Sequence, residues 1–162
     1  MTTTAPTSLN EKIADFLAQK RIAVAGISSS RPLPANLIYQ KLKAAGYQVI
    51  AIHPTAGEFE GDQCYPNLAA VPVAIDGLVI ATKPAITLDL VQQALTSGVP
   101  RIWMHESLMQ AGTSVSPEAV ELCRANNLCL IAGACPMMYC QPVDFGHRCM
   151  GWIMRVTGGL PN

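Results

Sequence analysis

Five short, nearly continuous apolar runs recur along this chain and constrain its fold more than any other feature. They are RIAVAG, YQVIAIHP, DGLVIAT, RIWMHE and LCLIAGA, at 21–26, 47–54, 76–82, 101–106 and 128–134. Strands with one face in water alternate apolar and polar residues, whereas continuous apolar runs are typical of parallel strands covered on both faces. The runs therefore predict a buried parallel sheet.

Helical patterns alternate with these runs. Apolar residues recur at helical spacing between them, and glycines end two of the segments, at Gly46 and Gly98. We expect helices over 9–19, 34–45, 85–97, 117–126 and 145–157, and a short one around 67–70. Ser116 is the expected N-cap of the fourth long helix. This alternation predicts an α/β fold, a doubly wound parallel five-stranded sheet of order 3-2-1-4-5.

The length of 162 residues suits a single domain. We expect a flexible tail at 1–8, a ligand-binding domain at 9–141 and a helical C-terminal tail at 142–162 that packs on the domain. No apolar run approaches the roughly 18 residues that a membrane helix needs. The first residues lack the basic flank and apolar core of a secretory signal. A cytoplasmic protein without membrane contact is therefore expected.

The charge composition limits the classes of partner that this protein is expected to bind. Acidic and basic residues balance at 11 each, which argues against a nucleic-acid-binding surface. Only 14% of residues are charged, a low share for a monomer surface, so we expect a homodimer. The six cysteines form no CxxC pair, which argues against zinc-ribbon and thioredoxin-like sites.

Ligands of open parallel sheets bind beyond the carboxyl ends of the strands, where the strand order reverses. In the expected strand order, this reversal lies between the strands at 21–26 and 101–106. Gly26 permits a sharp turn there, and the next helix directs its N-terminus at it. Ser28, Ser29 and Ser30 offer hydroxyl groups, and Arg31 offers a cation suited to phosphate. Ordinary turn and capping roles are the alternative interpretation of these residues.

Two common phosphate sites do not fit this turn. The P-loop pattern G-x-x-x-x-G-K-[ST] is absent. An NAD site needs three glycines in the turn and an acid at the end of the second strand. Here the turn has Gly26 alone, and the second strand ends in His53 and Pro54. A phosphate-bearing ligand that makes no such ribose contact fits better.

The motifs VAGISSSRP, VIAIHP, VIATKP, RIWMHES and GACPMMY together resemble the small coenzyme A-binding proteins, free-standing relatives of the N-terminal domain of the succinyl-CoA ligase alpha subunit. The resemblance covers about 11–140. It implies a Rossmann-like fold that binds CoA or acyl-CoA through its ADP part. The ligase domain has a fuller glycine pattern in its first turn, and its second domain has no counterpart here, so ligase activity is not carried over. The resemblance implies these ligand-binding positions: Gly26, Ser28, Ser29, Arg31, His53, Pro54, Thr82, Lys83, Pro84, His105 and Cys135.

A catalytic alternative stays open at this point. His105 and Cys135 follow two neighbouring runs and could form a nucleophilic pair in a small thiol-dependent enzyme that handles acyl-CoA. The competing interpretation is that both are structural residues at strand ends. A metal site formed by His105, Cys135 and His147 has no supporting ligand spacing. A CoA-binding protein without catalysis is the preferred hypothesis.

Overall fold

The computed structural model describes residues 6–55, 57–107 and 112–160. Within these ranges the long helices are α1 (Leu9–Leu17), α2 (Pro34–Ala44), α3 (Pro84–Thr96), α4 (Pro117–Ala125) and α5 (Phe145–Thr157). Two short 3-10 helices are η1 (Leu68–Ala70) and η2 (Pro136–Met138). All the predicted helices are confirmed, with ends that differ by up to two residues. Ser116 caps α4 as predicted, because its side chain accepts a hydrogen bond from the backbone N–H of Ala119.

The five apolar runs are confirmed as parallel strands, but their predicted order is wrong. They form β1 (Arg21–Ala25), β2 (Gln48–Ile52), β5 (Gly77–Ile80), β6 (Arg101–Met104) and β7 (Cys129–Ala132). Two shorter strands, β3 (Glu58–Phe59) and β4 (Asp62–Tyr65), extend the sheet to seven. The observed order is β3-β4-β2-β1-β5-β6-β7. The third apolar run thus pairs with β1 and not with β2.

The extra strands explain this order. β4 pairs in parallel with the end of β2, and β3 folds back antiparallel onto β4. The hairpin turn between them has positive φ angles at Glu60 (51°) and Gly61 (82°), as the tight turn of a two-residue hairpin requires. Because the hairpin covers the free edge of β2, the chain crosses to the other side of β1 before β5 begins.

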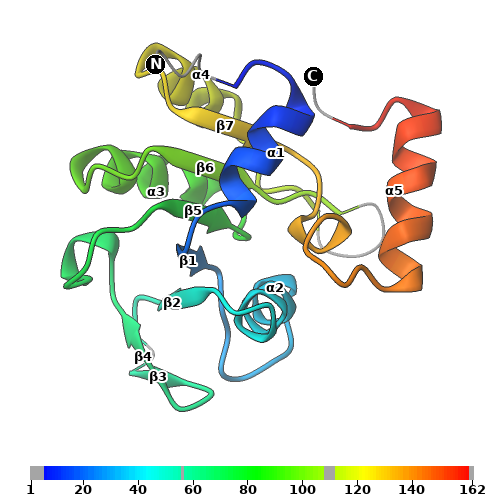
Figure 1. Cartoon of the computed structure of the whole chain (residues 1–162). Coiled ribbons are helices and arrows are strands. Elements are labelled where there is room, and N and C mark those ends of the chain that lie inside the picture. The colour runs from blue at the N-terminus through cyan, green and yellow to red at the C-terminus, as the bar shows by residue number, and fades with distance from the viewer. Residues whose placement is uncertain (1–5, 56, 108–111, 161–162) are drawn as a thin grey trace.

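Helices cover both faces of the sheet, which confirms the doubly wound architecture (Figure 1). Alternate strand residues such as Leu78 and Ile102 pack against α3 and α4. The residues between them, such as Val79 and Trp103, pack against α1 and α2. Each face therefore has its own apolar core, and the strands between them are almost completely buried.

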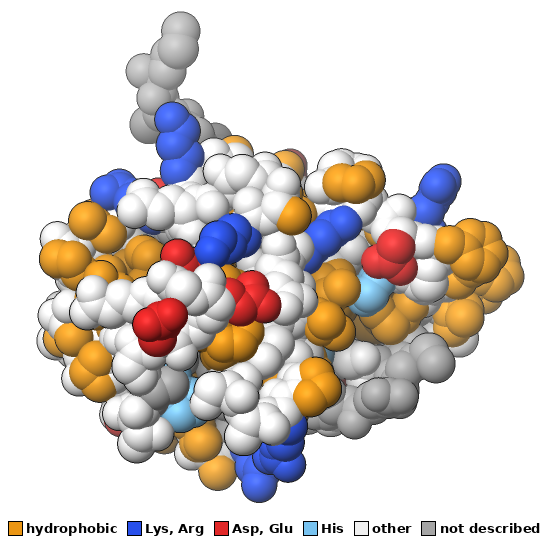
Figure 2. Space-filling view, turned by 90° about the horizontal axis from the view of Figure 1, so that it is seen from below, with side chains coloured by type: hydrophobic (Ala, Val, Ile, Leu, Met, Phe, Trp, Pro, Cys, Tyr) orange, Lys and Arg blue, Asp and Glu red, His pale blue; other side chains and the backbone are white. Residues whose placement is uncertain are grey.

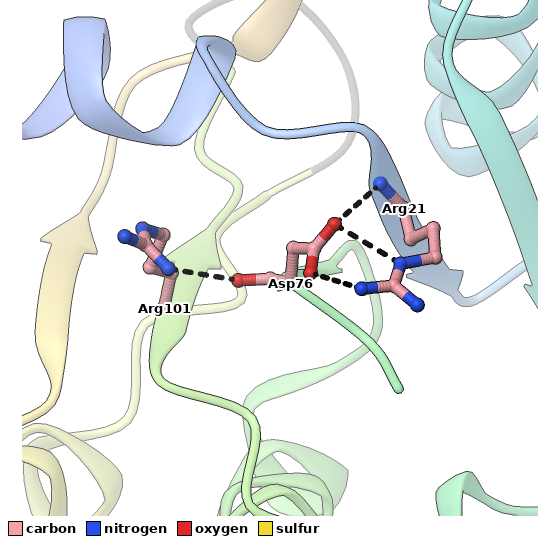
Figure 3. Close-up of polar contacts among 3 residues, drawn as sticks. All are labelled: Arg21, Asp76 and Arg101. Carbon is pink, nitrogen blue, oxygen red and sulfur yellow. Dashed lines mark hydrogen bonds and ion pairs between the residues drawn. The ribbon is translucent and has the colours of Figure 1, made fainter. Parts of the chain in front are cut away.

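Ion pairs join the amino ends of the strands. The guanidinium of Arg21 contacts the carboxylate of Asp76 at 3.0 Å, and the backbone N–H of Arg21 donates to the same carboxylate (Figure 3). Arg101 donates to the backbone carbonyl of Asp76 at 3.4 Å and pairs with Asp15 of α1 at 2.7 Å. The acids at the amino ends of the strands thus neutralise the arginines there, and these ion pairs stabilise the fold.

The last helix packs against η2 and the loop that follows β7. Met150 and Met154 of α5 are buried against Met138 and Cys135, in and beside η2. Apart from this strip α5 is largely exposed. No helix within the described ranges is long and apolar enough to cross a membrane.

Candidate functional site

The strand order moves the predicted ligand crevice by one strand. The chain leaves β1 toward β2 and leaves β5 toward β6, so the order reverses between β1 and β5. The predicted reversal between 21–26 and 101–106 is wrong for this reason. Ala25 is in register with both Ile52 and Ile80, so the loops after β1, β2 and β5 begin at the same level. Ligands of such sheets bind at this level.

Gly26 lies where the β1 and β5 loops come closest. Its φ is +107°, a conformation that side chains with a Cβ rarely adopt. A Cβ at this position would lie 2.3 Å from the carbonyl oxygen of Ala81 and 3.2 Å from Cγ2 of Thr82. The glycine is therefore required both by the turn and by the close approach of the neighbouring backbone.

A buried asparagine holds the turn that follows. The Asn36 side chain accepts a hydrogen bond from the backbone N–H of Ser28 at 3.0 Å and donates to the Ser28 carbonyl at 2.7 Å. The Ser28 hydroxyl accepts from the backbone N–H of Ser30 and lies 3.2 Å from the Ser30 hydroxyl. Ser29 and Arg31 stay exposed. The Ser28 N–H is thus already used, whereas its hydroxyl and the exposed side chains of Ser29, Ser30 and Arg31 can still donate to a ligand.

The first turn of α2 offers fewer free donors than the sequence pattern indicates. Pro34 has no N–H, and the N–H groups of Asn36 and Leu37 both donate to the Leu33 carbonyl. Arg31 therefore supplies the main positive charge at this position, and the helix terminus adds its dipole.

The loops after β2 and β5 lie on either side of the β1 turn. The His53 backbone N–H donates to the Tyr65 carbonyl, and its Nδ1 accepts from the N–H of Thr55 at 3.2 Å. Lys83 is the exposed N-cap residue of α3, and Pro84 is its first helical residue. Within the described ranges neither Arg31 nor Lys83 pairs with a carboxylate. Two cations without acidic partners thus belong to the loops that meet at the strand reversal.

Ser114 joins the next two loops, a role that the sequence analysis missed. Its hydroxyl donates to the Thr82 carbonyl at 2.7 Å, and its N–H donates to the His105 carbonyl at 2.8 Å. Its own carbonyl accepts from the Thr87 hydroxyl at 2.7 Å. Ser114 is 2% exposed and so secures the loops after β5 and β6 from within the protein.

His105 and Cys135 are both buried at the carboxyl ends of β6 and β7. Burial, together with the nearby His147, lowers the pKa of His105 to about 4. Burial raises the pKa of Cys135 to about 11, although the N–H groups of Met137 and Met138 oppose this shift. At neutral pH both side chains are uncharged, and a thiol in this state is a poor nucleophile. No group of three potential metal ligands gathers among the residues that the structure describes.

The burial of His105 predicts a pH-dependent stability. The unfolded chain binds a proton at His105 below about pH 6.5, whereas the folded chain resists it down to about pH 4. Stability that is present above pH 6.5 is therefore lost as the pH falls. When the pH is lowered from 7 to 4.5, the free energy of unfolding measured in urea should fall by about 2–3 kcal/mol more in wild type than in His105→Gln. Equal losses in both proteins would contradict the buried neutral histidine.

Comparisons with known proteins agree with this architecture. The family model described as the CoA binding domain matches residues 20–141. The uncharacterized protein YneT of Bacillus subtilis (strain 168) is 23% identical over 116 residues, which cover 72% of this chain and 82% of YneT. A hypothetical protein from Pyrococcus horikoshii OT3 superposes with a TM-score of 0.72 at 27% identity, covering 85% of this chain and 93% of that one.

A larger enzyme contains a similar unit. The dinucleotide-forming acetyl-coenzyme A synthetase 1 of Ca. Korarchaeum cryptofilum, solved in complex with phosphate and ADP, is 30% identical with a TM-score of 0.51. The match covers 54% of this chain but only 19% of the synthetase. Because the family model spans most of the chain, from the residue before β1 to the residues beyond η2, this protein belongs to the CoA binding domain family.

Proposed function

We propose that this protein binds CoA or an acyl-CoA, with the ADP part of the ligand at the turn after β1. The observation that carries the proposal is a pair of cations at the strand reversal, Arg31 and Lys83, which have no acidic partner among the residues that the structure describes. At the opposite edge of the sheet, Arg21 and Arg101 are paired with acids. Cations left unpaired at one edge suit a ligand rich in phosphate.

The surroundings of the turn define the remaining contacts that we propose. The hydroxyl groups of Ser28 and Ser29 would donate to phosphate oxygens, beside the close approach that Gly26 permits. His53 and Pro54 would flank the nucleotide on the β2 side, and Thr82 and Pro84 would flank it on the β5 side. His105 and Cys135 would lie deeper, toward the rest of the ligand. The absence of an acid directly after β2 continues to favour CoA over NAD.

The preferred role is binding without a reaction. The raised pKa of Cys135 weighs against the thiol-dependent alternative, because a thiol that stays protonated attacks thioesters slowly. The family membership concerns the binding domain, and the match covers only 19% of the synthetase. Ligase chemistry therefore forms no part of the proposal.

Calorimetry with three ligands tests the proposal. CoA and ADP should bind more tightly than NAD, because all carry a diphosphate but the site lacks the acid that grips the NAD ribose. Arg31→Ala or Lys83→Ala should weaken CoA binding by about tenfold or more, since a charge-assisted contact contributes roughly 1.5–3 kcal/mol. The loss should shrink as salt rises, because added ions screen the same attraction.

Two further variants make the test specific. Arg124→Ala removes an exposed arginine of α4 that pairs with Glu121, and it should leave the affinity for CoA unchanged. Cys135→Ser should also change affinity little, whereas the thiol alternative requires it to abolish acyl-CoA hydrolysis. Unaltered CoA affinity in both cation variants, or tighter binding of NAD than of CoA, would place the ligand elsewhere.

The homodimer expected from the composition stays a prediction. Its strongest support is one face of α5, where apolar side chains recur at helical spacing and lie in solvent. Phe145 is 82% exposed, Ile153 44% and Val156 67%. A second copy of the chain would cover this face at little cost in desolvated charge.

A further inference from the structure

A groove lies between α5 and the segment around η2, outside the turn where the nucleotide is proposed to bind. Its volume is about 400 Å³. Met138, Tyr139, His147, Arg148, Trp152 and Arg155 line it. In Figure 2, α5 lies at the right, where basic, acidic and histidine side chains lie beside exposed hydrophobic ones. The volume is sufficient for a small organic molecule.

The charge of this groove is positive and unbalanced. Arg148 and Arg155 are two helical turns apart on one face of α5, and none of the described residues that line the groove with them is acidic. Within the described ranges neither arginine forms an ion pair. The nearest acid on the helix, Asp144, caps α5 and contacts the His147 ring at 2.6 Å, so its oxygens are already engaged. Arg155 also acts on Tyr139, where its charge opposes the rise that burial causes in the tyrosine pKa.

The remaining walls are apolar and aromatic. Trp152 is 67% exposed at the rim, although tryptophan is normally well buried. The Met138 side chain is buried beside it at the base of α5. Aromatic faces and thioethers bind flat or apolar groups, while arginines bind phosphate or carboxylate. Both kinds of surface lie within one groove.

We propose that this groove binds an organic anion, with a phosphate or carboxylate held by Arg148 and Arg155 and a ring or apolar portion against Trp152. This inference goes beyond the proposed function and does not depend on it. The anion has two possible sources. The groove adjoins the carboxyl edge of the sheet, since His147 influences His105 and η2 directly follows the β7 loop. It can therefore receive the far end of a ligand bound at the β1 turn, or a separate small anion.

Phenyl phosphate is a suitable probe, because it combines one anionic group with one ring. The chain has two tryptophans, of which Trp103 is fully buried, so a change in fluorescence reports mainly on Trp152. Phenyl phosphate should change this fluorescence saturably, and more weakly as salt rises. Arg148→Gln and Arg155→Gln should each weaken binding by about tenfold. Arg124→Gln, an exposed arginine outside this groove, should bind as wild type does.

Competition with CoA and with an acyl-CoA distinguishes the two sources. If an acyl-CoA whose acyl group ends in a carboxylate displaces phenyl phosphate from wild type and CoA does not, the groove receives the far end of that ligand. If phenyl phosphate and that acyl-CoA bind together, the groove takes a separate anion. No saturable change in Trp152 fluorescence, or full affinity in both arginine variants, would overturn the inference. Failure of the proposed function would appear differently, as CoA binding that is absent or insensitive to Arg31→Ala and Lys83→Ala.

Discussion

Replacement of Gly26 by alanine is expected to cost more than about 4 kcal/mol of stability, which places it among the most damaging single substitutions. The added Cβ would lie 2.3 Å from the Ala81 carbonyl oxygen and 2.7 Å from its carbonyl carbon, and both are backbone atoms. Neither strand can shift to relieve the clash. Ala81 donates its N–H to Ala25, and β5 lies between β1 and β6 in the buried sheet. The positive φ adds about 1–3 kcal/mol of strain.

Gly46 provides a matched control for this substitution. It also has a positive φ, of +92°, but a Cβ there would meet nothing within 4 Å. Gly46→Ala should therefore show the conformational strain alone, about 1–3 kcal/mol, in urea unfolding followed by circular dichroism. The difference between the two variants measures the close approach of the β1 and β5 loops. Equal losses of stability in the two variants would contradict the close approach of the β1 and β5 loops and the ligand site placed beside it. Where Gly26→Ala remains folded, its affinity for CoA should also fall.

The sequence reveals the central strands and the helices because their signals are local. A strand covered on both faces needs an uninterrupted apolar run, and each such run in this chain became a parallel strand. Helix ends were equally readable where a capping side chain bonds its own helix, as Ser116 does. The strand order depends instead on β3 and β4. They are two and four residues long, carry polar residues such as Glu58 and Asp62, and have no clear alternation. Nothing in such short segments shows that they cover the edge of β2.

The residues of the candidate site also differ in whether local sequence reveals their role. Gly26 could be identified because a turn between a buried strand and a helix calls for a flexible residue. Asn36 and Ser114 could not, because no sequence pattern shows that Asn36 bonds the backbone of Ser28 or that Ser114 bonds residues far along the chain. Asn36 is a polar residue in the first turn of a helix, a common place for a solvated side chain, yet it is 8% exposed. Ser114 donates to the backbone carbonyl of a residue 32 positions away and accepts a hydrogen bond from the hydroxyl group of a residue 27 positions away.

Replacement of Trp103 by alanine should cost about 3–5 kcal/mol, the range for a large aromatic side chain removed from a core. Trp103 lies in β6 and is fully buried. Its ring meets Phe16 of α1 edge to face at a centroid distance of 5.3 Å, and Tyr139 at 6.0 Å. Its indole N–H donates to the Ala134 carbonyl at 3.2 Å. That carbonyl also accepts from Glu106, so Trp103 helps to hold the β7 loop, where Ala134 has a φ of +64°.

Two comparisons separate the packing of Trp103 from its hydrogen bond. Trp103→Phe keeps an aromatic ring beside Phe16 but removes the donor to Ala134, and it should cost less than alanine does, about 1–3 kcal/mol. Trp152→Ala removes the same type of residue from an exposed position and should change stability by about 0.5 kcal/mol or less. Urea unfolding of the three variants provides these values. A Trp103→Ala variant no less stable than Trp152→Ala would contradict the placement of Trp103 in the core. If the phenylalanine variant loses stability but the amide exchange of residues 133–135 is unchanged, Trp103 stabilises the protein by packing alone and does not hold the loop that carries Cys135.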